Sequence, residues 1–148
     1  MHQLIIPNVI TESDVRGLRP TDSAFEAAQV MQEMNVAALI VTNDAGKLVG
    51  IVTERDLTRR IIAGDKPAKD TTLEQIMTKD PSILSPSATA GEALELMRVR
   101  SIRHLPVVDD GRVVGMLSIR DLFFNVKRQL EDSIKETEAY VFGDRYGA

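Results

Sequence analysis

The stretch that decides the fold lies in the second half of the chain, at residues 104–122, and reads HLPVVDDGRVVGMLSIRDL. Its two apolar runs flank the step Asp110-Gly111, which is a strong signal for the turn of a β-hairpin. Ser118 and Asp121 follow at the spacing of a helix N-cap and an acidic third residue, a pair that satisfies backbone N–H groups at the start of a helix. The stretch therefore predicts two antiparallel strands that run directly into a helix.

The same pattern occurs earlier in the chain, where residues 38–57 read ALIVTNDAGKLVGIVTERDL. The similarity extends upstream, so that residues 18–57 align with residues 84–122 after one deletion, at Ala45 in the turn. Of the 39 aligned positions, 15 are identical. Because loops tolerate such deletions, we interpret the two stretches as two copies of one structural unit.

Each copy predicts the same order of elements. A short apolar segment with a proline leads into a helix, expected over about 22–34 in the first copy and 89–100 in the second. Ser23 and Thr89 stand three residues before glutamates, as in a capping box. A unit of about 60 residues buries little apolar surface by itself. We therefore expect an α/β fold in which two βαββα units pack sheet to sheet around a shared core.

The composition limits the kinds of functional site that the chain can contain. The 148 residues include no cysteine and two histidines, with a net charge of −4 and a pI near 5.2. Disulfides, thiolate zinc sites, iron–sulfur clusters and thiol nucleophiles are therefore excluded, and no metal site is expected. The acidic balance argues against a broad surface for nucleic acid, which is therefore not the expected partner.

The sequence pattern does not predict a membrane protein. The N-terminus lacks the basic and apolar regions of a signal peptide, and no apolar run approaches the ~18 residues of a transmembrane helix. We expect a cytoplasmic protein without a membrane partner.

A set of residues recurs in both copies: Ala27, Met31, 39–41 and 50–57 in the first, and Met77, Ala93, Met97, 105–109 and 115–122 in the second. This repeated signature resembles the CBS domain, a regulatory module named after cystathionine β-synthase. The resemblance covers roughly residues 10–125 and occurs twice, in order, at the spacing of a tandem pair. It implies a module with pseudo-twofold symmetry and two clefts. Many members bind adenine nucleotides or S-adenosylmethionine there and regulate an attached or partner protein without catalysis.

The first copy departs from the CBS pattern in two places. Residues 10–12 read Ile-Thr-Glu where residues 76–78 of the second copy read Ile-Met-Thr, and Ile40 stands where the second copy has Pro106. The departures leave the expected fold unchanged. The expected segments are a first CBS unit over 1–64, a linker over 65–72, a second CBS unit over 73–125, and a C-terminal helix and tail over 126–148.

The resemblance places two ribose-binding carboxylates at the starts of the helices that follow the hairpins. It implies that Asp56 and Asp121 hold a ribose, and that Thr53 and Ser118 support the ribose or the α-phosphate. A carboxylate can accept two hydrogen bonds from a ribose diol, and a helix N-terminus favours anions. The alternative that these residues only cap their helices stays open at this point.

The positive charge that a phosphate needs comes mainly from the second copy. Arg103 and His104 precede its first strand, a position that is basic in several nucleotide-binding CBS proteins, whereas residues 37–38 of the first copy are alanines. The resemblance thus implies asymmetric clefts. Two alternatives stay open. His104 caps an edge or pairs with an acidic neighbour, and Arg98 and Arg100 form a solvated helix face. Further candidates are Arg55 and Arg120 for charge, and Val36, Ile83, Ile102 and Met116 for an apolar slot around adenine.

The helix of the second copy continues well beyond the end of the repeat. From 119 to about 140 there is no proline or glycine, and apolar residues recur at three- and four-residue steps. This face either covers its own module or forms a homodimer contact, and CBS pairs commonly dimerise through helical faces. Residues 142–148 are expected to form a frayed tail or a partner contact. The loose seam consists of Phe123, Val126, Leu130, Thr137 and Tyr140.

The leading interpretation is a regulatory sensor that is not an enzyme. It binds an adenosine-containing ligand of the AMP, ADP or ATP class in the clefts and signals to a partner protein, as a homodimer. One alternative is a dimeric protein-interaction module that needs no ligand. Others are an S-adenosylmethionine or NAD-type ligand, or nucleic-acid binding. Catalysis is not expected, because the motifs contain no recognisable nucleophile, metal set or glycine-rich triphosphate loop, and no catalytic cofactor is implied.

Overall fold

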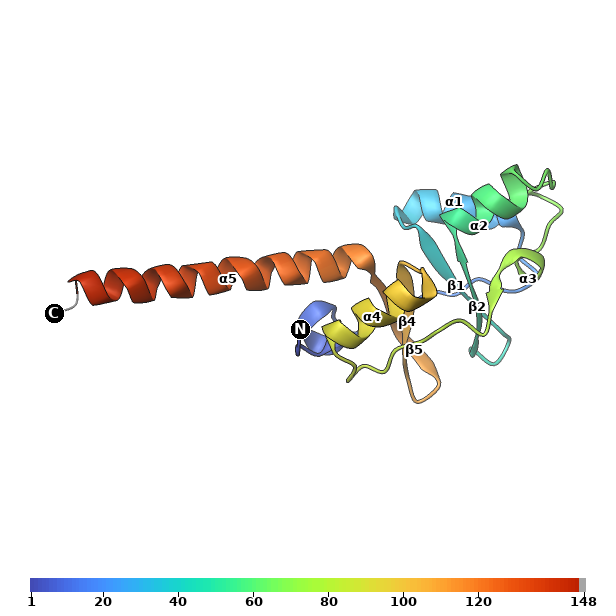
Figure 1. Cartoon of the computed structure of the whole chain (residues 1–148). Coiled ribbons are helices and arrows are strands. Elements are labelled where there is room, and N and C mark those ends of the chain that lie inside the picture. Colours follow the sequence, from blue (N-terminus) through green and yellow to red (C-terminus); the bar gives the residue numbers. More distant parts are fainter. Residues whose placement is uncertain (147–148) are drawn as a thin grey trace.

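The structure, a computed structural model, describes residues 1–146. Figure 1 shows two small α/β bodies and a long helix that leaves them at one end. The helical turns η1 and η2 are wide, because their hydrogen bonds join residues five apart, as from Ala63 N to Thr58 O at 2.9 Å. In chain order the elements are η1 (Ile5–Val9), α1 (Ala24–Met34), β1 (Ala38–Thr42), β2 (Leu48–Thr53), α2 (Glu54–Asp56), η2 (Leu57–Ile62), α3 (Leu73–Ile76), β3 (Thr78–Lys79), α4 (Ala90–Arg100), β4 (His104–Asp109), β5 (Arg112–Ser118) and α5 (Ile119–Tyr146).

The internal repeat is confirmed in the way the two equivalent helices begin and end. At the start of α1, Ser23 Oγ accepts a hydrogen bond at 3.1 Å from the backbone N–H three residues on, and Thr89 Oγ1 does the same for α4 at 3.2 Å. Both helices end at a residue in the left-handed conformation, Asn35 (φ 53°) and Ser101 (φ 54°). Each side-chain oxygen satisfies a backbone donor that the helix itself leaves without an acceptor.

The hairpins complete the expected βαββα order. β1 pairs antiparallel with β2, and β4 pairs antiparallel with β5. The segment that leads into each copy adds one parallel bridge, from Leu18 to Val41 in the first and from Leu84 to Val107 in the second. The predicted fold class, a pair of α/β units with an extended C-terminal helix, is therefore confirmed.

The two bodies exchange short segments of chain. β3, which precedes the second copy in sequence, pairs with β2 of the first, so that Thr78 lies opposite Ile51. In the reverse direction, Ser13 N donates to Val114 O in β5 at 2.9 Å. Both crossing segments run past a sheet of the other body, which ties the bodies together through backbone hydrogen bonds.

The hydrophobic cores follow the same exchange. Ile5 in η1 is fully buried in the core of the second body, whereas Leu73, Ile76 and Met77 are buried in the core of the first. Each core therefore also contains side chains from outside its own copy of the repeat. The physical reason is that each crossing segment buries its apolar side chains under the sheet that it pairs with.

The remaining apolar faces of the two sheets lie toward one another. Leu39 and Val41 belong to the first core, so the alternate residue Ile40 points to the opposite face of β1, and it is nevertheless buried. Pro106 on β4 alternates with core residues in the same way and is also fully buried. Burial on both faces agrees with the expected sheet-to-sheet packing.

α5 is anchored only at its start. Leu122 belongs to the second core, and Asn125 Nδ2 donates to Gln3 Oε1 at 2.7 Å. All residues from 130 to 143 are exposed, and Figure 1 shows the helix running away from both bodies. The tail expected from residue 142 is helical as far as Tyr146, and its last two residues lie outside the described ones. Within residues 1–146, no helix combines the length and hydropathy that crossing a membrane requires.

Candidate ligand-binding cleft

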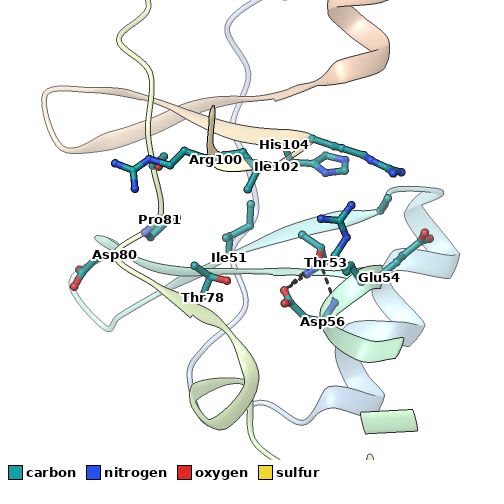
Figure 2. A pocket seen from close by; sticks show the side chains of 14 residues that line it. Ile51, Thr53, Glu54, Asp56, Thr78, Asp80, Pro81, Arg100, Ile102 and His104 are labelled. Atoms are coloured by element: carbon teal, nitrogen blue, oxygen red, sulfur yellow. Dashed lines mark hydrogen bonds between the residues drawn. The ribbon is translucent and has the colours of Figure 1, made fainter. Parts of the chain in front are cut away.

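A cleft of about 470 Å³ lies between the two bodies, where the ends of their hairpins meet. One wall comes from the end of β2 and from α2, and the opposite wall from residues 100–104, between α4 and β4. The crossing segment after β3, residues 80–82, closes one side (Figure 2). Because both bodies supply walls, a molecule bound here would contact the two repeats at once.

Asp56 holds one oxygen in the cap of α2, and its other oxygen accepts no hydrogen bond from the described residues. Its Oδ2 accepts from Thr53 N at 2.9 Å and from Thr53 Oγ1 at 3.2 Å, and Asp56 N donates back to Thr53 Oγ1 at 3.3 Å. Its Oδ1 lies 4.0 Å from Arg60 Nε, at the limit of an ion pair. Figure 2 shows Thr53 and Asp56 at the cleft wall. The cap fixes the carboxylate, and Oδ1 can accept from a ligand hydroxyl.

The second repeat builds the same cap in another place. Asp121 Oδ2 accepts from Ser118 N at 2.8 Å and from Ser118 Oγ at 2.9 Å. The two residues start α5 and do not line the cleft. Both copies of the motif cap a helix, but only Thr53 and Asp56 also line the cleft. The capping role is therefore separable from contact with a ligand in this cleft.

Basic side chains line the wall that the second body contributes. Arg100, Arg103 and His104 all border the cleft. On the facing wall Arg55 Nη1 donates to Ser101 O at 3.1 Å, so this guanidinium already joins α2 to the end of α4. The positive charge available to an anionic ligand thus comes mainly from Arg100 and Arg103 of the second body, while the capped carboxylate comes from the first.

His104 is half-buried at the start of β4. Burial lowers the pKa of its imidazole below the ordinary value of about 6.5, and the neighbouring guanidinium of Arg103 lowers it further. The carboxylates of Asp121 and Glu54 raise the pKa of His104, but the net shift remains downward. His104 is therefore neutral at neutral pH and can donate or accept a hydrogen bond.

Apolar side chains from both bodies meet in the middle of the cleft. Figure 2 shows Ile51 on β2 and Ile102 before β4 pointing toward one another, with Pro81 beside them. Ile102 also packs partly against the second core, which holds it in place. Two facing branched side chains with a proline at the edge form a slot suited to a flat, apolar ring.

Six of the sequence-predicted residues come together in this cleft: Thr53, Arg55, Asp56, Ile102, Arg103 and His104. Five lie elsewhere. Ile83 is about half exposed outside the cleft, Met116 lines a separate hollow with Arg128, and Arg120 lines another with Glu54. Ser118 and Asp121 cap α5, as described above. Arg98, which the sequence also left open, pairs with Glu95 at 2.6 Å on the surface.

The cleft also contains residues that the sequence interpretation missed. Thr78, Asp80 and Ser82 line it because the segment after β3 crosses to the sheet of the first body. The repeat alignment could not find them, since it relates equivalent positions and gives no information on which sheet a crossing segment joins. Arg100, in the last turn of α4, also lines the cleft. The sequence had left open whether it belongs to a solvated helix face.

The CBS-domain family model matches residues 9–63 and 73–128. This chain belongs to the CBS-domain family. Its match to a solved structure, the CBS domain NE2398, has 41% identity and a TM-score of 0.72, over 78% of this chain and 89% of the other. The structure of CBSX2 in complex with AMP is similar in fold, with 24% identity and a TM-score of 0.66, over 82% of this chain and 92% of that one.

Curated CBS relatives are longer than this chain. The mitochondrial CBS domain-containing protein CBSX3 of Arabidopsis thaliana is 33% identical over 126 residues, which is 82% of this chain and 61% of the relative. The protein CBSCBSPB5 of the same plant is 34% identical over 78% of this chain, which corresponds to 21% of that protein. The CBS pair therefore accounts for only part of these relatives.

Proposed function

We propose that this CBS pair is a non-catalytic regulatory module that binds an adenine nucleotide in the cleft between its two bodies. The observation that carries the proposal is the meeting of three groups in one cleft: the capped carboxylate of Asp56, the facing side chains of Ile51 and Ile102, and the hydrogen-bond donors Arg103 and His104. These groups match the ribose, the base and the phosphate of a nucleotide in turn.

Each group has a defined role in the proposed complex. Asp56 Oδ1 accepts from the ribose diol while Oδ2 stays in the cap. Ile51 and Ile102 enclose the adenine ring. Arg103, with His104, faces the phosphate, because guanidinium and imidazole groups are good donors to phosphate oxygens. Support from fold likeness comes from CBSX2, whose structure was solved with AMP.

A bound nucleotide would regulate by holding the two bodies together. Its ribose would contact the first body and its phosphate the second, so it favours whichever arrangement brings these walls to the right separation. A partner protein that binds this arrangement of the bodies differently from other arrangements then responds to whether the cleft is occupied. The proposed complex does not involve the five sequence-predicted residues that lie outside this cleft: Ile83, Met116, Ser118, Arg120 and Asp121.

Isothermal titration with AMP, ADP, ATP, NAD and S-adenosylmethionine tests the proposal. Asp56→Asn should weaken adenine-nucleotide binding about tenfold or more, since a charge-assisted hydrogen bond is lost. Asp121→Asn is the matched control, because it alters the equivalent cap outside the cleft. Absence of binding by all five compounds at millimolar concentration would reject the proposal. Equal loss of affinity in both variants would move the site away from the cleft.

A further inference from the structure

His104 lies where the cleft meets the start of the second hairpin. It opens β4, lies opposite Ser118 in β5, and lines the cleft together with Arg103. Figure 2 shows it on the wall of the second body, across the cleft from Thr53 and Glu54. The side chain is half-buried. The imidazole is therefore partly removed from water and yet open to a molecule in the cleft.

Charged groups from both bodies act on this imidazole. Burial, the largest effect, lowers the pKa of His104, Asp121 in α5 and Glu54 in α2 raise it, and Arg103 lowers it. The net result is a pKa below the ordinary value of about 6.5. Without a ligand the imidazole is thus neutral near pH 7, although two carboxylates favour its charged form. The other charged residues around the cleft and the adjoining hollow are Arg55, Asp56, Asp80, Arg100 and Arg120.

A phosphate in the cleft would change this balance. In the proposed complex it faces Arg103 and His104, and a monoester phosphate carries a charge of about −1.5 to −2 at pH 7. An opposite charge within about 4–6 Å favours the charged form of a titratable group and moves its pKa by about 1–3. A rise of that size converts a neutral histidine into a charged one near pH 7. Arg103 gains no proton, because a guanidinium is always charged.

We propose that His104 takes up a proton from the solvent when the phosphate of a ligand enters the cleft, so that binding tightens in mildly acidic solution. The inference rests on the proposed function and adds to it a dependence on acidity. A charged imidazolium donates through both ring nitrogens, and one of these N–H groups would go to the phosphate. Asp121 and Glu54 lie near enough to stabilise the new charge from either side of the cleft.

Proton linkage gives the direction of the effect. A histidine whose pKa is higher in the complex than in the free protein binds a proton when the complex forms. The affinity then rises as the pH falls through the pKa of the complex. The phosphate itself loses charge near pH 6, which weakens binding in the native chain and in every variant. A comparison between the native chain and a variant without the imidazole therefore isolates His104.

Isothermal titration of the full chain with AMP between pH 8 and pH 6 measures the effect. Over this range the affinity of the native chain should rise about three- to tenfold relative to that of His104→Gln. His2→Gln is the matched control and should follow the native chain, because His2 is exposed and does not line the cleft. The same pH dependence in the native chain and His104→Gln would overturn the inference and leave nucleotide binding in place. Absence of AMP binding at every pH would reject the proposed function, and this inference with it.

NMR of the native chain tests the same step without a substitution in the cleft. The sequence contains two histidines, so the imidazole Hε1 protons give two signals, which His2→Gln assigns. Saturating AMP should raise the pKa of His104 by about one or more, whereas adenosine, which lacks the phosphate, should not. The His2 signal should respond to neither compound. A pKa of His104 that AMP leaves unchanged would overturn the inference. An equal rise with adenosine would also do so, because the phosphate would then not be its cause.

Discussion

His104 shows how one side chain can link the cleft to the stability of the fold. It opens β4, lies opposite Ser118 in β5, and is half-buried beside Asp121 and Arg103. Burial is the main reason why its pKa lies below 6.5 in the folded protein. The unfolded chain, in contrast, exposes the imidazole at its ordinary value. The two states therefore bind different numbers of protons in mildly acidic solution.

The sign of this difference sets a pH dependence. Because the pKa of His104 is lower in the folded state, its contribution to the free energy of unfolding is complete above pH 6.5. That contribution is lost as the pH falls through the lower pKa of the folded state. We expect acidification from pH 7.5 to 5.5 to lower the midpoint of urea unfolding less in His104→Gln than in the native chain. Equal slopes in the two proteins would show that His104 does not titrate differently on folding.

Individual site residues were predictable to the extent that they lie within a motif. Thr53 and Asp56 follow from the repeat because the cap that aligns them is local in sequence. Asp121 obeys the same local rule, yet it does not line the same cleft. Local spacing determines the cap, whereas the position of a cap relative to a cleft depends on how the two bodies are placed.

Two equivalent glycines allow the crossing segments to pass close to the sheets. A Cβ at Gly50 would collide with the side chain of Met77 and lie 3.1 Å from Thr78 O, whereas a Cβ at Gly115 would lie 2.8 Å from Ile10 Cδ1. Backbone yields less readily than the end of a side chain. The structure thus pairs Met77 with Ile10, although the repeat alignment paired Ile10 with Ile76.

We predict that Gly50→Ala destabilises the protein by about 1–3 kcal/mol and Gly115→Ala by less, because only the first substitution presses on backbone. Gly143→Ala, on the exposed part of α5 where an added Cβ meets nothing, is the control. Urea unfolding monitored by circular dichroism provides the free energies. A larger loss for Gly115→Ala would mean that the approach of Ile10 is the more rigid one.

Elements with strong local signals were predicted well, and short crossing segments were not. The capping boxes and the hairpin turns placed α1, α4 and both hairpins, and the absence of glycine or proline placed most of α5. β3 contains two residues and exists only because it meets β2. η1 likewise contains isoleucines and a valine that would suit either core. No hydrophobic periodicity in the sequence indicates which strand or core such a short segment joins.

The two bodies are joined by more than their connecting chain. Ile5 crosses into the second core, Met77 crosses into the first, and Arg55 donates to Ser101 O between α2 and α4. Each core is therefore completed by a residue that lies outside its own copy of the repeat. Interlocked bodies of this size should unfold together, in one cooperative transition.

Ile5→Ala tests this coupling. It removes a fully buried side chain from the second core and should cost about 2–5 kcal/mol while leaving a single transition of unchanged urea dependence. Ile62→Ala, at a 77% exposed position, is the matched control and should change the stability by less than about 0.5 kcal/mol. Fluorescence of a dye on either body and circular dichroism should report the same midpoint. Two separate midpoints would show that the second body unfolds by itself, and the exchanged segments would then hold each core without coupling the two.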